Sequence, residues 1–403
     1  MALMAFAPLV AACLSAAAAA SEATFTGEAL IQADNRAVVM PWSISKSGDG
    51  GFYVTGSVGN NGWAVKVDAK GHVIWRYELQ EEEDGMRPHG AFVNAAVPAP
   101  DGGTYLCAKY RAGASRLVRL DGDGHEVNRI GFTPNAESRG DGTYDELDAA
   151  CLPWGDGFVY VGDEIFYQRY GAPPVNDGSD RFYWVVVFGR DGHVKKQWQI
   201  PAAVRWSARI VAYLDGSNLV LSKTDNTNTD IVRLDLSEGS ISKQKIPGSA
   251  FVIAPLRTFS FFSFLRSTES QVLLFQQGIL FLSKDLRDQT KAVAPPPDFL
   301  ALKAYSQGDG AYMLLGRRMH GYAPKPGKQL VFTSKTSHAW RIVDLPLSAP
   351  PVYSDTDYVV DMTGGYKRNQ FVVIRRLARA FNPTDPSHPP VLDTVVLDFV
   401  EIN

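Results

Sequence analysis

The feature that most constrains the fold is a short internal repeat. Residues 65–72 (VKVDAKGH) recur as residues 118–125 (VRLDGDGH), with a divergent copy at residues 186–193 (VVFGRDGH) and a shorter one at residues 232–235 (VRLD). Alternating apolar and basic residues predict a β-strand with one buried face. Asp followed three positions later by Gly is typical of a type I turn. Each copy therefore predicts a strand that enters a hairpin.

A second signal, a Gly- or Asp-containing turn before a run of aromatic and β-branched residues, accompanies this repeat. Clear copies begin at Asp49, Asp101 and Asp156, and weaker copies begin at Asp215, Glu269, Asp309 and Arg368. The copies follow one another at intervals of about fifty residues, close to the length of a four-stranded propeller blade. We therefore expect an all-β chain that folds as a seven-bladed β-propeller.

Composition agrees with one large domain over residues 21–403. The chain has 403 residues, of which 45% are hydrophobic, and no linker rich in Pro, Gly or Ser divides it. A propeller can exceed the usual size of a single core, because each blade buries its faces against the next. The formal net charge of -3 argues against a nucleic-acid partner, since phosphate binding needs a basic surface.

The last repeat predicts only three strands, at residues 358–362, 370–375 and 394–400. Residues 23–31, near the other end of the chain, are the candidate for the fourth strand. Pairing the two ends would close the ring and protect an exposed sheet edge from aggregation. We therefore predict closure by an N-terminal strand that joins the last blade.

Residues 1–20 contain no charged side chain and are dominated by small and apolar residues, which predicts an export signal. Ala18 and Ala20 form an A-x-A pattern that favours cleavage before Ser21. Residues 10–13 also resemble a lipobox, in which Cys13 would be acylated and tether the chain to a membrane; a transmembrane anchor is a third option. Beyond Ser21, no run approaches the ~20 apolar residues needed to span a bilayer. We expect a periplasmic or secreted protein, or a lipoprotein anchored through Cys13.

The body of the chain contains two cysteines, Cys107 and Cys151, each inside a predicted strand. An exported pair can form a disulfide. Stacked sheets lie ~10 Å apart, however, and bridged cysteines need Cα atoms within about 7 Å. We therefore favour buried packing of two unbridged cysteines, with the disulfide as the alternative.

The first repeat also carries a family resemblance. Residues 67–75 (VDAKGHVIW), which follow residues 50–56 (GGFYVTG), resemble the repeats of bacterial quinoprotein-like β-propellers, which contain pyrroloquinoline quinone (PQQ)-like repeats. In that family, Asp and Gly precede a Trp on the strand that docks onto the next blade, and Trp75 and Trp198 stand at matching positions. The family includes quinone-dependent dehydrogenases and non-enzymatic envelope lipoproteins that scaffold outer-membrane assembly.

The resemblance alone does not choose between these branches, and the motifs of the chain favour the non-enzymatic one. The larger quinone dehydrogenases carry an adjacent cysteine pair and a Ca²⁺-binding set of Glu, Asn and Asp, and no motif of this chain matches either feature. We therefore assign no cofactor. Asp121 and Asp123 lie in a repeated hairpin, so we interpret them as turn residues rather than a Ca²⁺ loop. We assign no metal ligand.

A hydrolase is the other enzymatic alternative, but no G-x-S-x-G motif occurs and no triad is recognisable. His72, His125 and His193 recur at one position of successive repeats, which favours a structural or solvent role over catalysis. We assign no catalytic residue. An enzyme of the quinoprotein-like dehydrogenase or hydrolase type, with its site at the channel mouth, remains the alternative to a binding protein.

Propeller geometry predicts where a binding site would lie. The connections between the second and third strands open on one face, and they are long at residues 163–181, 317–322 and 379–390. In the first of these, Tyr167 and Arg169 are candidate contact residues. Residues that open each blade approach the channel on the same face, and these candidates are Trp42, His89, Asp145, Glu146, Arg205, Trp206 and Asp357. We expect this face to bind a protein partner or a polar ligand, as a scaffold or binding protein does.

Overall fold

The computed structural model describes most of the chain between Ala23 and Ile402. The described residues are 23–32, 38–80, 82–83, 88–89, 91–110, 115–132, 143–167, 181–202, 211–224, 228–247, 250–252, 254–255, 271–275, 278–282, 289–293, 299–308, 311–320, 323–324, 329–334, 341–345, 357–366, 369–377 and 394–402. The predicted leader and Cys13 lie outside them. Within these ranges the chain is all-β, as predicted, and no segment is a helix that could cross a membrane.

Six four-stranded sheets, one six-stranded sheet and one two-stranded ribbon contain the described strands. The first sheet is formed by β2 (Val39–Lys46), β3 (Phe52–Val58), β4 (Asn61–Val67) and β5 (Val73–Leu79). The second is formed by β8 (Ala91–Pro98), β9 (Thr104–Tyr110), β10 (Ser115–Leu120) and β11 (Glu126–Phe132). The ribbon β6 (Glu82–Glu83) and β7 (Pro88–His89) lies between them in the sequence.

The next three sheets repeat this up-and-down order. The third contains β12 (Thr143–Trp154), β13 (Gly157–Tyr167), β14 (Arg181–Phe188) and β15 (Val194–Pro201). The fourth contains β16 (Val211–Asp215), β17 (Asn218–Thr224), β18 (Asn228–Asp235) and β19 (Ile241–Pro247). The fifth contains β20 (Ala250–Val252), β22 (Gln271–Phe275), β23 (Gly278–Leu282) and β24 (Gln289–Val293).

The sixth sheet has extra strands. It contains β25 (Phe299–Gly308), β26 (Ala311–His320), β28 (Gln329–Ser334) and β29 (Arg341–Asp344); β21 (Ala254–Pro255) pairs with β25 in parallel, and β27 (Ala323–Pro324) pairs with β26. Residues 317–320 therefore continue β26, which corrects the expectation of a loop there. The expected loop at residues 379–390 lies outside the described ranges.

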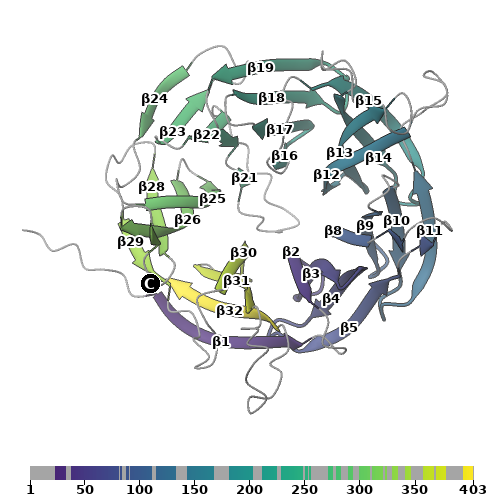
Figure 1. Ribbon diagram of the computed structural model, residues 1–403, viewed down its shortest axis with the longest axis horizontal. Coiled ribbons are helices and arrows are strands. Elements are labelled where there is room, and N and C mark those ends of the chain that lie inside the picture. Colours follow the sequence, from purple (N-terminus) through teal and green to yellow (C-terminus); the bar gives the residue numbers. More distant parts are fainter. Residues whose placement is uncertain are drawn as a thin grey trace, which may run out of the picture.

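The last sheet joins the two ends of the chain. Its order is β1 (Ala23–Gln32), β32 (Thr394–Ile402), β31 (Gln370–Leu377) and β30 (Asp357–Gly364). β1 runs antiparallel to β32, from Ala23 opposite Ile402 to Gln32 opposite Thr394. Figure 1 shows the sheets arranged around a ring, with first strands such as β2, β8 and β30 near the centre and β1, β5, β11 and β19 along the outside.

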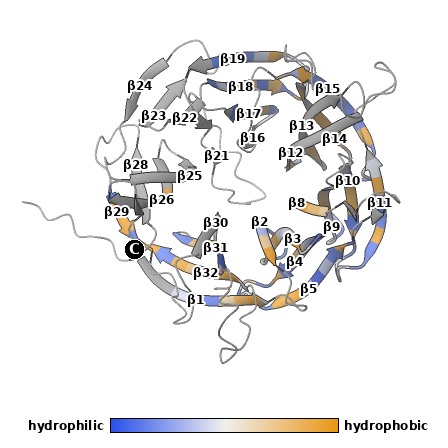
Figure 2. Cartoon of the chain, in the orientation of Figure 1, coloured by the Kyte–Doolittle hydropathy of each residue, from blue (hydrophilic) through white to orange (hydrophobic). Residues whose placement is uncertain are grey.

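The hydrophobic core lies between neighbouring sheets. Each buried cluster combines side chains from two of them, for example Ile31 and Val395 with Phe52, Leu79 with Leu106, Cys107 with Phe158, and Val185 with Leu219. In Figure 2 the apolar positions accordingly follow the strands around the ring rather than gather at one centre. This sheet-on-sheet burial lets a chain of this length fold without linkers.

The repeated motif forms the turn between the third and fourth strands of a sheet, as predicted. In the first copy, Asp68 Oδ1 accepts hydrogen bonds from the backbone N–H groups of Lys70 (2.8 Å) and His72 (2.9 Å). In the second copy, Asp121 Oδ1 accepts the equivalent N–H groups of Asp123 and His125, both at 2.9 Å. The imidazoles of His72 and His125 are exposed and lie against these same Asp side chains, which fits the structural role predicted for them.

The prediction of one buried face on these strands was wrong. Lys66 alternates with Val65 and Val67, yet all three are buried, because each sheet packs on both faces. Lys66 tolerates burial because its ammonium lies 2.6 Å from the Asp49 carboxylate. The alternation therefore marks which face holds an ion pair rather than which face meets water.

The hairpin turn of one sheet packs on the outer strand of the sheet before it. Gly124, in the β10–β11 turn, lies so close to Trp75 of β5 that a Cβ there would come within 2.6 Å of the indole Cγ. Gly239, in the β18–β19 turn, faces Trp198 of β15 in the same way. The two tryptophans therefore dock onto the following sheet, as the resemblance implied.

Cys107 and Cys151 form a disulfide, which corrects the expectation of two unbridged cysteines. Cys107 lies on β9 and Cys151 on β12, and their Cα atoms are 6.4 Å apart. The ~10 Å spacing of stacked sheets did not apply, because β12, the inner strand of the third sheet, approaches β9 of the second sheet closely enough for a bridge. The disulfide therefore links two neighbouring sheets.

Candidate functional site

The end of the third sheet where β12 begins dominates the candidate site. We call it the β12–β13 extension, because these two strands, of 12 and 11 residues, are the longest of the described strands. β12 begins at Thr143 and β13 ends at Tyr167, and these two residues are partners in the antiparallel register. β13 also pairs with β14, from Phe158 opposite Phe188 to Ile165 opposite Arg181. Residues 163–167 therefore belong to a strand, which corrects the expectation that the whole segment 163–181 is a loop. Arg169 lies outside the described ranges.

This extension brings together three of the predicted site residues. Asp145 is the register partner of Ile165, Glu146 is the partner of Glu164, and Tyr167 lies two positions beyond Ile165. Acidic residues thus occupy consecutive register positions beside an aromatic one, at the end of the sheet where β12 begins. The sequence could not show this pairing, because charged residues such as Asp163 and Glu164 are typical of loops.

The other predicted residues are more scattered. His89 lies on β7 and pairs with Glu82 in the small ribbon, just before the inner strand β8. Asp357 is the first residue of the inner strand β30, opposite Leu377. Arg205 and Trp206 lie outside the described ranges.

Trp42 lies on β2, the inner strand of the first sheet, and its ring is half-buried. It packs edge-to-face on Phe92 of β8, with ring centroids 5.7 Å apart and planes at 86°. Such a pair contributes roughly 0.5–1.5 kcal/mol beyond area burial. Phe92 was missed by the sequence analysis, because only proximity between two inner strands identifies it.

A β-bulge recurs on the inner strands. The register between β2 and β3 shifts between Pro41 and Ser43, which leaves Trp42 as the extra residue. Shifts at the corresponding place on other inner strands leave Asn94 on β8, Leu147 on β12, Leu302 on β25 and Val360 on β30 as extra residues. A bulge changes the direction of a side chain and often stands next to a functional site.

Asn94 ties the first two inner strands together at its bulge. Its carbonyl oxygen accepts hydrogen bonds from Ser43 Oγ (3.2 Å) and Thr55 Oγ1 (3.4 Å), both on the first sheet. The side-chain amide nitrogen of Asn94 is buried, and no described residue accepts a hydrogen bond from it. An unsatisfied buried donor is costly, so this amide suits an acceptor supplied by a ligand or water.

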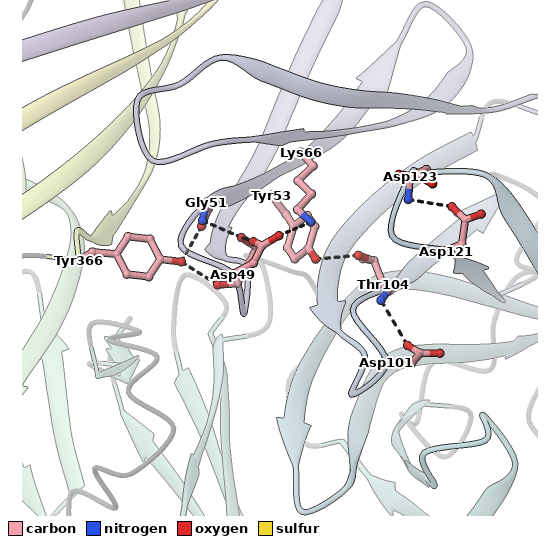
Figure 3. A network of polar contacts seen from close by, with 11 residues as sticks. Asp49, Gly51, Tyr53, Lys66, Asp101, Thr104, Asp121, Asp123 and Tyr366 are labelled. Atoms are coloured by element: carbon pink, nitrogen blue, oxygen red, sulfur yellow. Dashed lines mark hydrogen bonds and ion pairs between the residues drawn. The ribbon is translucent and has the colours of Figure 1, made fainter.

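A polar network joins the sheets at the other end of the strands, where the β2–β3 turn lies (Figure 3). Tyr366, which follows β30, has its hydroxyl 2.7 Å from the carbonyl oxygens of both Ser47 and Gly51. On the other side of the first sheet, Thr104 Oγ1 donates to the Tyr53 hydroxyl at 2.8 Å. The network therefore runs from the last sheet through the first to the second.

Burial raises the pKa of both tyrosines. Removal from water raises the pKa of Tyr53 to about 12 and that of Tyr366 to about 12, so both hydroxyls keep their protons at neutral pH. Burial also acts to raise the pKa of Asp49, but hydrogen bonds from Lys66 and Ser47 outweigh it and lower that pKa. The network thus has fixed protonation and stabilises structure.

The same acid–base pair recurs in successive sheets. An acidic residue in or directly before the turn between the first two strands pairs with a basic residue of the third or fourth strand. These pairs are Asp49 with Lys66, Asp101 with Arg119, Asp156 with Lys195, and Asp215 with Arg233. In the third sheet Val187 stands where the others have the basic residue, and Lys195 on the next strand takes its place. In each of these four sheets, the two repeated sequence signals thus meet in one ion pair.

Asp121, Asp123 and His125 are the one group of potential metal ligands among the described residues, with ligand atoms within 4.8 Å of one another. Asp121 uses one carboxylate oxygen for the backbone of its own turn. Calcium takes six to eight oxygen ligands, more than this exposed turn offers. The hydrogen bonding supports the interpretation of Asp121 and Asp123 as turn residues.

The inner strands near Trp42 and the β12–β13 extension therefore combine an aromatic pair, a buried amide donor and a row of acidic positions. These groups suit non-covalent recognition of a polar or cationic group.

Comparison with solved structures shows which fold this is. The chain is similar to BBS1N in its complex with ARL6DN (10% identity, 95% of this chain and 97% of that chain, TM-score 0.51). It is also similar to the Dos1 propeller (9% identity, 89% of this chain and 78% of that chain, TM-score 0.50). The acylaminoacyl peptidase of Pyrococcus horikoshii aligns at 10% identity and a TM-score of 0.47 over 88% of this chain, which spans 50% of the peptidase.

No protein-family model and no curated protein sequence matches the chain. The likeness to solved structures at these identities concerns the fold, which is a β-propeller built of antiparallel sheets.

Proposed function

We propose that this chain is an exported seven-bladed β-propeller, closed by its N-terminal strand β1, that acts in the cell envelope as a binding or scaffold protein. Its binding face is the end of the sheets where β12 begins. The described residues form seven sheets of four or more strands, which supports the blade count. The pairing of β1 with β32 supports the closure. The propeller of BBS1N was solved with a protein bound, which fits a role in protein binding.

The observation that carries the proposal is the β12–β13 extension. β12 and β13 are the longest of the described strands, and they place Asp145, Glu146 and Tyr167 at the end of the sheet where β12 begins. Rigid elements that project from a scaffold are common binding sites, and aromatic residues often contribute most of the energy of an interface. A basic surface on a protein partner or a cationic ligand would complement the acidic positions.

The disulfide supports export. Cys107 and Cys151 are both buried and bridged, and disulfides form and persist mainly in oxidising compartments such as the periplasm. Together with a leader at residues 1–20, this favours a periplasmic or secreted protein, or one anchored through Cys13. The docking of Trp75 and Trp198 onto the following sheets favours the quinoprotein-like repeat family. The non-enzymatic branch is favoured because no motif matches the cysteine pair or the Ca²⁺-binding set of the dehydrogenases.

Site-specific photocrosslinking tests the proposed face. A photoreactive amino acid at position 167, in the full chain expressed in its own cells, should give discrete adducts with an envelope protein. The control is position 127, because Val127 is 65% exposed on the outer strand β11, away from the extension. Adducts at both positions, or at 127 alone, would contradict the proposal, and Asp145→Lys with Glu146→Lys should abolish specific adducts at 167.

A further inference from the structure

Lys46, the last residue of β2, is a buried lysine in an unusual setting. Its side chain is 4% exposed, and its Nζ lies 4.8 Å from the centroid of the Tyr366 ring. The Tyr366 hydroxyl is held by the carbonyl oxygens of Ser47 and Gly51 at 2.7 Å each, as Figure 3 shows for Gly51. The ring is therefore fixed over the ammonium group.

The carboxylate of the adjoining β2–β3 turn pairs with a different lysine. Asp49, three residues after Lys46, lies 2.6 Å from Lys66 Nζ and also accepts a hydrogen bond from Ser47 Oγ at 2.5 Å. Two buried lysines thus share a neighbourhood that contains one carboxylate, and Lys66 takes it. Among the described residues, no carboxylate pairs with Lys46.

The Tyr366 ring satisfies only part of what an ammonium group needs. An ammonium has three N–H donors, and an aromatic face compensates for lost water on one side. Burial lowers the pKa of Lys46, and no neighbouring charge offsets it. Among the described residues, the other titratable groups of this neighbourhood are Asp49, which pairs with Lys66, and the two tyrosines with raised pKa values.

The repeat itself does not require a lysine at this place. Lys46 is the register partner of Phe52 at the start of the second strand, and the corresponding residues of the second and last sheets are Pro98 and Gly364. Structural residues of the repeat, such as the paired acids and bases, recur from sheet to sheet. A costly buried amine that occurs once indicates a role outside the repeat.

The geometry points to Lys46 Nζ, beneath the Tyr366 ring, as a binding site for a carboxylate group, either of a small organic acid or of an acidic side chain. A bound carboxylate would replace water at the ammonium and give it the opposite charge that it lacks. The site lies at the end of β2, four residues beyond Trp42, and so is separate from the proposed partner face.

Lysine-selective NMR tests this site. In the full chain labelled with ¹³Cε-lysine, the signal missing from Lys46→Met identifies Lys46, and pH titrations are run in acetate and in chloride of equal ionic strength. Acetate should raise the Lys46 pKa by about one unit at saturation, a tenfold change in the protonation equilibrium, because an anion favours the charged form. Lys66 is the internal control, since its carboxylate partner is already present. Identical Lys46 titrations in acetate and chloride would overturn the proposal, as would equal shifts at every lysine.

Two further measurements distinguish a small organic acid from an acidic side chain as the source of the carboxylate, and control for misfolding of the variant. Succinate and the blocked amino acid N-acetyl-glutamate-methylamide are compared as probes, and tighter binding of the second favours a protein side chain. Acetate should raise the melting temperature of the native chain and of Lys195→Met, a lysine at a different sheet, but not of Lys46→Met. A stabilisation by acetate that survives in folded Lys46→Met would show that the anion binds elsewhere.

Discussion

At the scale of single residues, Gly124 meets two constraints that can be separated experimentally. Its φ is +88°, and a Cβ would lie 2.6 Å from Trp75 Cγ, whereas Gly102 has a φ of +86° with nothing within 4 Å of its Cβ position. Gly102→Ala should cost about 1 kcal/mol, from the left-handed backbone alone. Gly124→Ala should cost about 2–4 kcal/mol, because Trp75 must also move. Denaturant unfolding measures both, and equal costs would contradict the docking role of Trp75.

Asp235 provides a residue-scale test of pH dependence. The backbone N–H groups of Glu238 (3.0 Å) and Ser237 (2.8 Å) donate to its Oδ1, and the hydrogen bond from Glu238 contributes most to lowering the Asp235 pKa. A lowered pKa stabilises the folded state above the unfolded value of about 3.9, and this stabilisation is lost as pH falls through the folded value. Asp235→Asn should therefore lower the melting temperature at pH 7 but much less at pH 3. A constant difference across this range would show that ionisation of Asp235 is irrelevant.

At the scale of the elements, the bridge between β9 and β12 can be tested by a mutant cycle. Replacing either Cys107 or Cys151 by Ala should cost about 2–4 kcal/mol of unfolding free energy, because the bridge closes a segment of 44 residues in the unfolded chain. The double variant should cost little more than either single variant, since all three lack the same bond. Additive costs, or free thiols in the native chain by mass spectrometry, would contradict the bridge.

The strands show what could be predicted from sequence. Residues 370–375 and 394–400 were expected as strands and lie within β31 and β32, because their apolar and β-branched residues have no competing interpretation. Burial of Lys66 was missed, because its partner Asp49 lies in a different turn and only the folded sheet brings them together. The strand at residues 163–167 was missed for a related reason. Its acidic residues are register partners of β12 residues and lie beyond the hydrophobic part of β13, so no apolar pattern in the sequence indicates a strand there. Of the candidate site, the sequence identified Trp42 but not Phe92 or Asn94.

At the scale of the whole molecule, β1 is the element whose loss should matter most for association. Deleting residues 1–32 would leave the backbone of β32 unpaired along its outer side, and unpaired sheet edges promote aggregation. The truncated protein should form oligomers and melt at a lower temperature, as measured by light scattering and calorimetry. Deleting residues 1–22 alone is the matched control, because it keeps β1. A monomeric 1–32 deletion with unchanged melting temperature would show that β1 is dispensable.

The pairing of β1 with β32 also has a consequence for the order of events during biosynthesis. Thr26 donates to the carbonyl oxygen of Phe399, a contact that spans 373 residues. The first strand to leave the ribosome must therefore wait for the last one before it finds its partner, while the sheets between them can assemble from neighbouring segments. A chain that terminates early would hold an unmatched first strand and lack the last sheet. Completion of synthesis and completion of the fold thus coincide, and proteases or chaperones that recognise free strands could distinguish finished chains from unfinished ones.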